Sequence, residues 1–316
     1  MIGFDIGGTK CAVSVGHEES GRLVIDQKRV IPTDLSISPY EMIDRMCELA
    51  DGMTQDFSRI GISCGGPLDS RRGVILSPPN LPGWDEIKIV EYLKARYHGE
   101  VALQNDANAC AIAEWKYGAG RGCENMIFLT FGTGLGAGLI LGGRLYAGSS
   151  DMAGEVGHVR LRKSGPVGFG KAGSFEGFCS GSGIAQFGRA YAKEQLRLGN
   201  TVSFCKNEEA LSSITAKSIA ECADAGHDDA RSIYAICGKH LGEGLSLLID
   251  ILNPQKIVIG SVFLRAEHLL REAMEEVIRR EALWHASSVC EILPAGLGEQ
   301  LGDYAALSVA ANANYL

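Results

Sequence analysis

The sequence lacks the features that mark several classes of protein. No apolar run reaches the roughly 18 residues that a membrane span needs, and no charged segment precedes a hydrophobic one as in an export signal. No basic run is present that could follow a nucleic-acid backbone, and the formal net charge is −8. We therefore expect a cytoplasmic protein that binds neither nucleic acid nor a membrane.

Closely spaced cysteines are also absent. The chain has 10 cysteines, but the nearest pair, Cys110 and Cys123, is too far apart for a CxxC motif or a pair of metal ligands. We interpret them as reduced thiols, which agrees with a cytoplasmic location.

The sequence has enough apolar residues for two domains. It is 316 residues long and 46% hydrophobic, and it contains no low-complexity segment. Strands are expected at 2–6, 11–17, 22–31 and 59–64, with a helix near 39–51. A second set of strands is expected at 126–131, 137–141 and 144–147. Each set contains a strand, a glycine turn and a strand, so we predict an α/β fold with an internal duplication and a cleft between its halves.

The last third of the chain is expected to be mainly helical. Apolar residues recur at helical spacing over 228–252, and Pro254 ends that helix. A strand follows at "KIVIG", and further helices are expected near 267–282 and 303–313. The final helix is apolar enough to pack back across the first domain.

Two glycine turns are the first candidates for a ligand site. "DIGGTK" at 5–10 alone fits either a phosphate cradle or the tight turn of a hairpin. "FGTGLGAG" at 131–138 repeats it in the second half, and two such hairpins can hold one triphosphate. The Thr9 and Thr133 hydroxyls suit phosphate oxygens, and Asp5 suits Mg²⁺ held through water. Lys10 either neutralises phosphate charge or is a solvated strand residue.

Asp106 is the candidate general base. In "LQNDANACAIAEW" a strand ends at Asn105 and Asp106, where a helix begins. Asp at such a junction commonly caps the helix. A carboxylate in the predicted cleft can instead take the proton of a hydroxyl that attacks phosphorus, while Asn105 orients the same substrate.

Glu155 and His158 are further candidates with ordinary alternatives. They share one side if their segment is helical, but Gly154 and Gly157 suit a loop equally well. The alternative for Glu155 is a solvated surface acid, and the alternative for His158 is a structural histidine.

Together these motifs resemble the ROK sugar kinases, which have the actin-like ATPase (ribonuclease H-like) fold. The resemblance covers nearly the whole chain. It rests on "DIGGTK", "GGPLD" at 65–69, "NLPGW" at 80–84, "NDANACAIAEW" at 105–115, "GAGRG" at 118–122, "GTGLGAGLILGGRL" at 132–145, "AGEVGH" at 153–158 and "IVIG" at 257–260.

The resemblance implies a role for each candidate. Asp106 is implied to be the catalytic base, and the sugar is implied to contact Gly66, Asn80, Asn105, Asp106, Glu155, His158 and Glu176. The nucleotide and its Mg²⁺ are implied to contact Asp5, Gly7, Gly8, Thr9, Lys10, Gly132, Thr133, Gly134, Gly136 and Gly260. It also implies a small domain of residues 1–108 plus 300–316, a large domain of residues 109–299, and a homodimer.

The implied reaction is ATP-dependent phosphorylation of a free hexose. Glucose and its 6-hydroxyl are the first expectation. Fructose, mannose, allose, N-acetylglucosamine and N-acetylmannosamine are alternatives, because single hydroxyl contacts decide such preferences. A sugar-responsive regulator is a rival from another class, but we expect no DNA-binding domain because the phosphate hairpin starts at residue 5. A pseudokinase is a second rival, although Asp5 and Asp106 are both present.

One segment departs from the family. Relatives carry three cysteines that bind a structural zinc together with a histidine, and the matching positions here are Val167, Phe169 and Ser174. Structural zinc needs four nitrogen or sulfur ligands, and His158 with Cys179 supplies two at most. We therefore expect no zinc, with Val167 and Phe169 providing apolar packing in its place.

Overall fold

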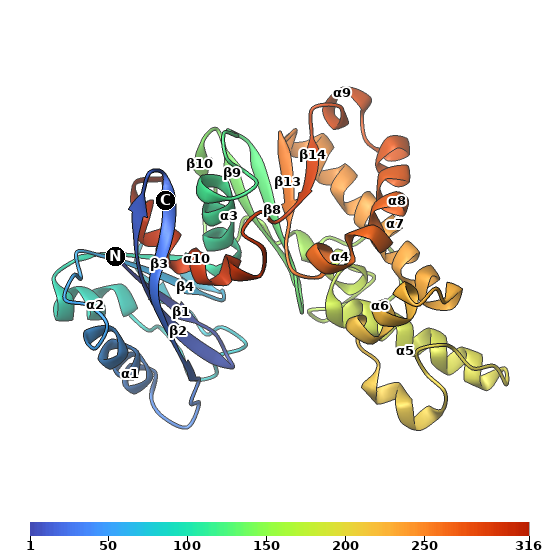
Figure 1. Ribbon diagram of the computed structural model, residues 1–316, viewed down its shortest axis with the longest axis horizontal. Helices are drawn as coiled ribbons and strands as arrows, with labels where there is room; N and C mark the ends of the chain where they lie inside the picture. The colour runs from blue at the N-terminus through green and yellow to red at the C-terminus, as the bar shows by residue number, and fades with distance from the viewer. Residues whose placement is uncertain (316) are drawn as a thin grey trace. The chain divides into compact units, whose positions relative to one another are not determined.

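The computed structural model describes residues 1–315 (Figure 1), and these residues separate into two compact units. Unit 1 comprises Met1–Phe128, Gly138–Gly154 and the segment from Ala295 onward, and unit 2 comprises Leu129–Ala137 and Glu155–Pro294. Residues 109–128 and 138–154 thus belong to the unit that contains the N-terminus, whereas the predicted division placed them in the large domain. Leu316, included in the predicted small domain, lies outside the described residues.

Unit 1 is built on a five-stranded sheet of order β3-β2-β1-β4-β7. β1 pairs antiparallel with β2 and parallel with β4, and β4 pairs parallel with β7. The strands are β1 (Ile2–Ile6), β2 (Lys10–Glu19), β3 (Arg22–Pro32), β4 (Arg59–Cys64) and β7 (Glu100–Asn105). The strands expected at 2–6, 11–17, 22–31 and 59–64 are confirmed as β1 to β4, although β2 begins one residue earlier than expected, at Lys10, and continues to Glu19.

Helices α1 (Pro39–Asp51) and α2 (Ile89–Tyr97) cover one face of this sheet (Figure 1). Ser38 and Glu41 form a capping box at the start of α1, where Pro39 suits the first turn. The apolar residues of α1 recur every three or four positions and pack on the side chains of Ile2, Phe4 and Ile6. Alternate residues of β1 therefore form the core, and Gly3 and Asp5 lie on the opposite face.

Helix α10 (Leu301–Ala311) packs on that opposite face, against β1 and β4. A Cβ atom at Gly61 would lie 2.1 Å from the Ala306 carbonyl oxygen and 2.4 Å from the Ala310 nitrogen. At Gly3 a Cβ would lie 2.8 Å from the Leu307 nitrogen. Glycine is therefore required at both positions for the helix backbone to lie directly on the strands. The prediction that the final helix packs across the first part of the chain is confirmed.

The second five-stranded sheet has the order β10-β9-β8-β13-β14. The unit boundaries fall within β8 and β9. A glycine turn joins these two strands, as it joins β1 and β2, so the predicted repetition of this hairpin is confirmed. The strands are β8 (Met126–Phe131), β9 (Leu135–Leu141), β10 (Arg144–Leu145), β13 (Lys256–Ile259) and β14 (Glu291–Pro294).

Unit 2 contains most of the remaining helices. The predicted helix over 228–252 is α7 (Asp228–Leu252), which ends at Asn253 in the left-handed conformation before Pro254. Helix α8 (Val262–Glu281) starts five residues before the predicted 267, because a non-helical Ala266 interrupts its first turns. The other helices are α3 (Asp106–Tyr117) of unit 1 and α4 (Phe175–Phe178), α5 (Gly181–Arg197), α6 (Ala216–Asp224) and α9 (Trp284–Ser287).

Short elements complete the described chain. Two small hairpins pair β5 (Leu68–Asp69) with β6 (Val74–Ile75) and β11 (Val167–Gly168) with β12 (Lys171–Ala172). The 3-10 turns are Val156–His158, Glu208–Ser213, Gly298–Gln300 and Ala313–Tyr315. Among residues 1–315, no helix combines the length and apolar character needed to cross a bilayer.

Candidate active site

Three parallel strands of unit 1 end in register at one edge of the sheet. Ile6 pairs with Cys64, and Cys64 pairs with Asn105. The residues that follow these strands are the first glycine turn, the Gly66 loop and Asp106. Ligands of open α/β sheets bind at the carboxyl ends of the strands, so the topology brings these distant parts of the sequence to such an edge.

The first glycine turn joins β1 to β2 and leaves its tip exposed. The Gly7 N–H donates to the Lys10 carbonyl at 3.2 Å, and the Thr33 hydroxyl donates to the Gly7 carbonyl at 2.6 Å. A Cβ at Gly8 would lie 2.3 Å from the Asn80 carbonyl oxygen, so only glycine fits there. Thr9 and Lys10 are exposed. The structure thus brings Asn80 to the turn and leaves the Thr9 and Lys10 side chains accessible to a ligand.

Asn105, and not Asp106, caps helix α3. The Asn105 Oδ1 atom accepts from the Ala107 N–H at 2.9 Å in the N-cap position. Asp106 is the first residue of the helix, and its Oδ1 atom accepts from the same N–H at 2.8 Å. The reading of Asp106 as the N-cap is therefore wrong. A Cβ at Gly66 would lie 3.1 Å from Asn105 Nδ2, which places the Gly66 loop beside this amide.

Burial raises the pKa of both aspartates at this edge. Burial and, second, the charge of Asp106 raise the pKa of Asp5 to about 6, while Lys10 and Lys28 oppose the shift. Desolvation also raises the pKa of Asp106. Asp106 keeps an exposed surface, so water screens part of that shift. A cation near this pair would favour the ionised form of both carboxylates.

The chemistry of this edge fits Mg²⁺ held mainly by water and phosphate. Mg²⁺ commonly takes one or two protein carboxylates and keeps several waters, and Asp5 offers such a carboxylate. No group of three or more histidine, cysteine, aspartate or glutamate side chains in residues 1–315 is arranged to hold a metal ion. Asp5 could thus supply one carboxylate to such an ion, and water and ligand oxygens would have to fill the other positions.

Three thiols lie close enough to Asp5 for its negative charge to affect their pKa values. Burial is the largest cause that raises the pKa of Cys11, Cys64 and Cys110, and the negative charge of Asp5 adds to it in each case. They therefore stay protonated at neutral pH. Nothing in the spacing of these three cysteines along the chain indicates that they lie near the same carboxylate.

The second glycine turn lies between β8 and β9, and its unit 2 part is held by its own backbone and by α5. The Gly132 N–H donates to the Gly134 carbonyl at 3.0 Å, and the Gly181 N–H donates to the Gly132 carbonyl at 2.8 Å. The Ser182 hydroxyl donates to the Thr133 carbonyl. Gly136 N–H donates to the Thr130 hydroxyl at 2.9 Å, and Gly260 N–H donates to the Leu129 carbonyl at 3.0 Å.

Gly181 and Ser182 were not among the sequence candidates. The sequence feature that could have identified them is Ser180, which precedes them and caps α5. The pattern "SGSG" at 180–183 could have indicated a helix start, although nothing in it indicates the distant partner.

Glu155 and His158 lie on one short turn, and Glu176 reaches the second glycine turn. Val156–His158 is a single 3-10 turn preceded by Glu155, so both side chains are displayed on a turn, and both are exposed. The Glu176 Oε2 atom accepts from the Leu135 N–H at 3.0 Å. A Cβ at Gly134 would lie 2.7 Å from that oxygen. A side chain at position 134 would therefore displace the Glu176 carboxylate from this position.

The segment that departs from the zinc-binding pattern is held by hydrogen bonds. Val167 and Phe169 are 45% and 76% exposed, so the prediction that they provide apolar packing is wrong. A two-residue strand pair is too short to enclose them. The Lys171 ammonium donates to the His158 carbonyl at 2.7 Å, and Arg160 donates to the Ala172 carbonyl at 2.6 Å.

Ser174, at the third cysteine position, has a different use. It is fully buried and caps α4 by accepting from the Gly177 N–H at 3.1 Å. Cys179 is also fully buried, and its thiol donates to the Cys237 carbonyl at 3.6 Å.

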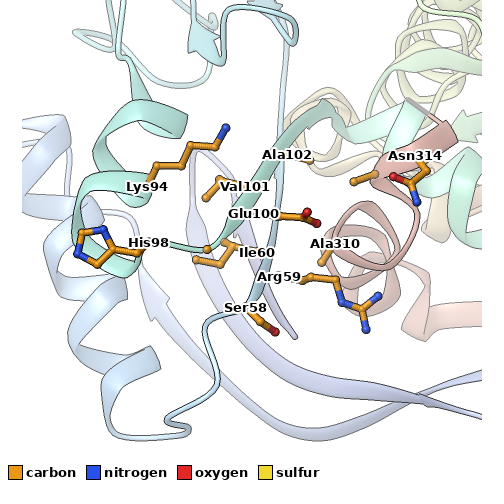
Figure 2. Close-up of a pocket in the computed structure, with 12 residues that line it drawn as sticks. Ser58, Arg59, Ile60, Lys94, His98, Glu100, Val101, Ala102, Ala310 and Asn314 are labelled. Atoms are coloured by element: carbon orange, nitrogen blue, oxygen red, sulfur yellow. The ribbon is translucent and has the colours of Figure 1, made fainter.

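Unit 1 also contains a pocket of about 760 Å³, and Figure 2 shows the residues that line it. Its lining includes Arg59 and Glu100, the first residues of β4 and β7, together with Lys94 of α2. The predicted site residues of unit 1 follow the opposite ends of those strands. This pocket is therefore separate from the candidate site.

The chain matches a known protein family along nearly its whole length. The sequence model of the ROK family matches residues 1–312. A glucokinase from Streptomyces coelicolor is 29% identical and covers 98% of this chain and 96% of its own length. A bifunctional enzyme NanE/NanK from Brucella melitensis is 30% identical over 98% of this chain and 54% of its own length.

Solved structures give the same result for the fold. A ROK hexokinase from Thermus thermophilus has a TM-score of 0.80 at 29% identity, over 99% of both chains. A ROK family glucokinase from Streptomyces griseus, in complex with glucose and AMPPNP, has a TM-score of 0.76 at 28% identity, over 98% of this chain and 99% of its own. The predicted α/β actin-like ATPase fold is confirmed. The chain belongs to the ROK family.

Proposed function

We propose that this chain is an ATP-dependent sugar kinase that phosphorylates a free hexose, with glucose and its 6-hydroxyl as the first candidate. The observation that carries the proposal is the edge of unit 1, where the first glycine turn and Asp106 follow parallel strands in register. Family membership and the named glucokinase and hexokinase relatives support a sugar kinase. The NanE/NanK relative keeps N-acetylmannosamine and other hexoses as alternatives.

In unit 1, Asp106 is proposed as the general base. Its carboxylate takes the proton of the attacking sugar hydroxyl, whose oxygen bonds to the γ-phosphorus of ATP as the bond to the leaving ADP oxygen breaks. Asn105, Gly66 and Asn80 border the sugar. Asp5 is proposed to hold Mg²⁺ through water, and such an ion would supply positive charge that offsets the negative charge of the phosphates. Gly7, Gly8, Thr9 and Lys10 are proposed to contact the phosphates.

In unit 2, the second glycine turn is proposed to hold the nucleotide, and three side chains are proposed to hold the sugar. Glu155, His158 and Glu176 offer carboxylate and imidazole groups to sugar hydroxyls. The proposed nucleotide contacts are Gly132, Thr133, Gly134, Gly136 and Gly260. We also propose the homodimer that the family resemblance implies and the cytoplasmic location expected from the composition of the sequence.

The test is ADP release measured across a panel of hexoses and N-acetylhexosamines, for the wild type and Asp106→Asn. We expect Asp106→Asn to lower kcat by about 100-fold or more, because it removes the base and keeps a polar side chain of the same shape. Sugar affinity, measured by calorimetry, should change little. Asp26→Asn, at a carboxylate of β3 that pairs with His17, is the matched control and should leave kcat unchanged.

Three results would each contradict one part of the proposal: the base, the kinase activity or the substrate. Normal turnover by Asp106→Asn would remove Asp106 from the base role. Sugar binding without ADP release by the wild type would favour a regulator or a pseudokinase. Preferred turnover of an N-acetylhexosamine would keep the kinase and change the substrate.

A further inference from the structure

The β11–β12 hairpin has an unusual residue at its tip. Val167 and Gly168 pair with Lys171 and Ala172, so Phe169 and Gly170 form a two-residue turn. Their φ angles are 42° and 75°, both in the left-handed region. Such turns favour Asn-Gly, because asparagine and glycine tolerate this conformation and a bulky side chain does not. The turn therefore holds Phe169 in a strained backbone conformation.

Phe169 gains too little stability from burial to offset this backbone strain. Its side chain is 76% exposed, the highest value among the exposed large apolar residues of the described chain. Large aromatic side chains gain stability mainly from the apolar surface that they remove from water. Neither turn geometry nor core packing accounts for a phenylalanine here, and an unexplained strained residue points to a functional contact.

The hairpin lies directly beside two proposed sugar ligands. The centroids of the Phe169 and His158 rings are 6.4 Å apart, with the rings nearly perpendicular. The Lys171 ammonium bonds to the His158 carbonyl and fixes the hairpin to that turn. A Cβ at Gly168 would lie 2.8 Å from the Cβ of Glu176, so the residue before Phe169 packs on Glu176. The exposed ring is thus held next to His158 by the strand pair that contacts Glu176.

We propose that Phe169 is a specificity-determining residue whose ring packs against the C–H face of the bound sugar. This inference rests on the proposed function. A pyranose presents hydroxyls at its rim, which suit Glu176 and His158, and C–H groups on its faces, which suit an aromatic ring. Phe169 favours a hexopyranose with one face free of axial hydroxyls, and the bound sugar covers the apolar surface that the hairpin exposes.

The test separates the turn from the contact by using Phe169→Asn. Asparagine suits the left-handed turn, so the melting temperature should stay the same or rise. The KM for the preferred hexose should rise about 10-fold, which corresponds to loss of one aromatic contact, while the KM for ATP stays unchanged. Phe169→Tyr should keep the KM for the sugar within about threefold. Val167→Thr, which removes other exposed apolar surface from the same hairpin, should leave both constants unchanged.

Calorimetric sugar affinity is measured in parallel with activity. A wild type that releases no ADP would overturn the proposed function, and the affinities of the wild type and Phe169→Asn would still decide the inference. Equal sugar affinity for these two proteins would overturn the inference, as would an equal loss in Phe169→Tyr. Loss of a dimer in Phe169→Asn, seen by sedimentation with sugar affinity unchanged, would show that a second copy covers the ring and would also overturn it.

Discussion

Glu114 is expected to be one of the most sensitive positions in unit 1. It lies near the end of α3 and is fully buried. Its Oε2 atom accepts from the Ala119 N–H at 2.8 Å and the Gly296 N–H at 3.0 Å, and its Oε1 atom accepts from the Leu297 N–H at 2.9 Å. Gly296 and Leu297 follow the point at which the chain enters unit 1 from unit 2. One carboxylate thus anchors the returning segment to α3.

The stability lost when Glu114 is replaced can be worked out from these three hydrogen bonds. A hydrogen bond to a charged group contributes about 1.5–3 kcal/mol, and a buried donor left without a partner costs about 1–3 kcal/mol. Because the three bonds share one carboxylate, their contributions do not add fully. We expect Glu114→Ala to lower the free energy of unfolding by about 3–5 kcal/mol.

Glu114→Gln should lose less. The glutamine side-chain oxygen can still accept the two hydrogen bonds that Oε2 accepts in Glu114. The glutamine amide nitrogen would face the remaining N–H donor, so we expect the free energy of unfolding to fall by about 1–3 kcal/mol. Urea unfolding, followed by fluorescence of the buried Trp115 next to Glu114, measures both changes. Glu48→Gln, at an exposed glutamate of α1, is the control and should change stability little. A loss under about 1 kcal/mol in Glu114→Ala, or equal losses in both variants, would refute this reasoning.

Two further predictions follow from the site. Because the folded chain raises the pKa of Asp5 from 3.8 to about 6, ionisation of Asp5 destabilises the fold above about pH 6 and has no such effect below about pH 4. Asp5→Asn should therefore stabilise the protein more at about pH 7.5 than at about pH 4 in urea unfolding, and a gain independent of pH would contradict this. Gly134→Ala places a Cβ 2.7 Å from Glu176 Oε2 and should raise the KM for sugar several-fold, since it displaces that carboxylate. Gly302→Ala, where nothing lies within 4 Å, is the control, and equal kinetics in the two variants would count against a role for Glu176.

The elements with strong local signals could be predicted from the sequence. Strands such as 2–6, 59–64 and 126–131 are short apolar runs followed by glycine or polar turns, and they lie at those positions in the structure. Helix α7 has a long apolar period and a proline after its end. The first turns of α8 lie before the predicted start because a non-helical Ala266 interrupts the helix, and no local sequence pattern marks that interruption.

The candidate site shows the same limit. The turns of Gly7 and Gly134 are visible in the sequence, because glycine clusters mark tight turns. The bond from Leu135 N–H to Glu176 spans 41 residues, and no local pattern indicates it. The error over Val167 and Phe169 has a physical cause, since apolar residues need a surrounding core and a hairpin of two-residue strands cannot provide one.

The place of α10 bears on how the chain folds during synthesis. Gly3 and Gly61 lie against the backbone of the helix formed by residues 301–311, so the face of β1 and β4 that bears them stays uncovered until those residues leave the ribosome. Domains usually fold in the order in which they are made. Here the sheet of β1 and β4 is synthesised before unit 2, but its core is complete only when α10 has been made. Unit 2 can therefore fold before unit 1 does.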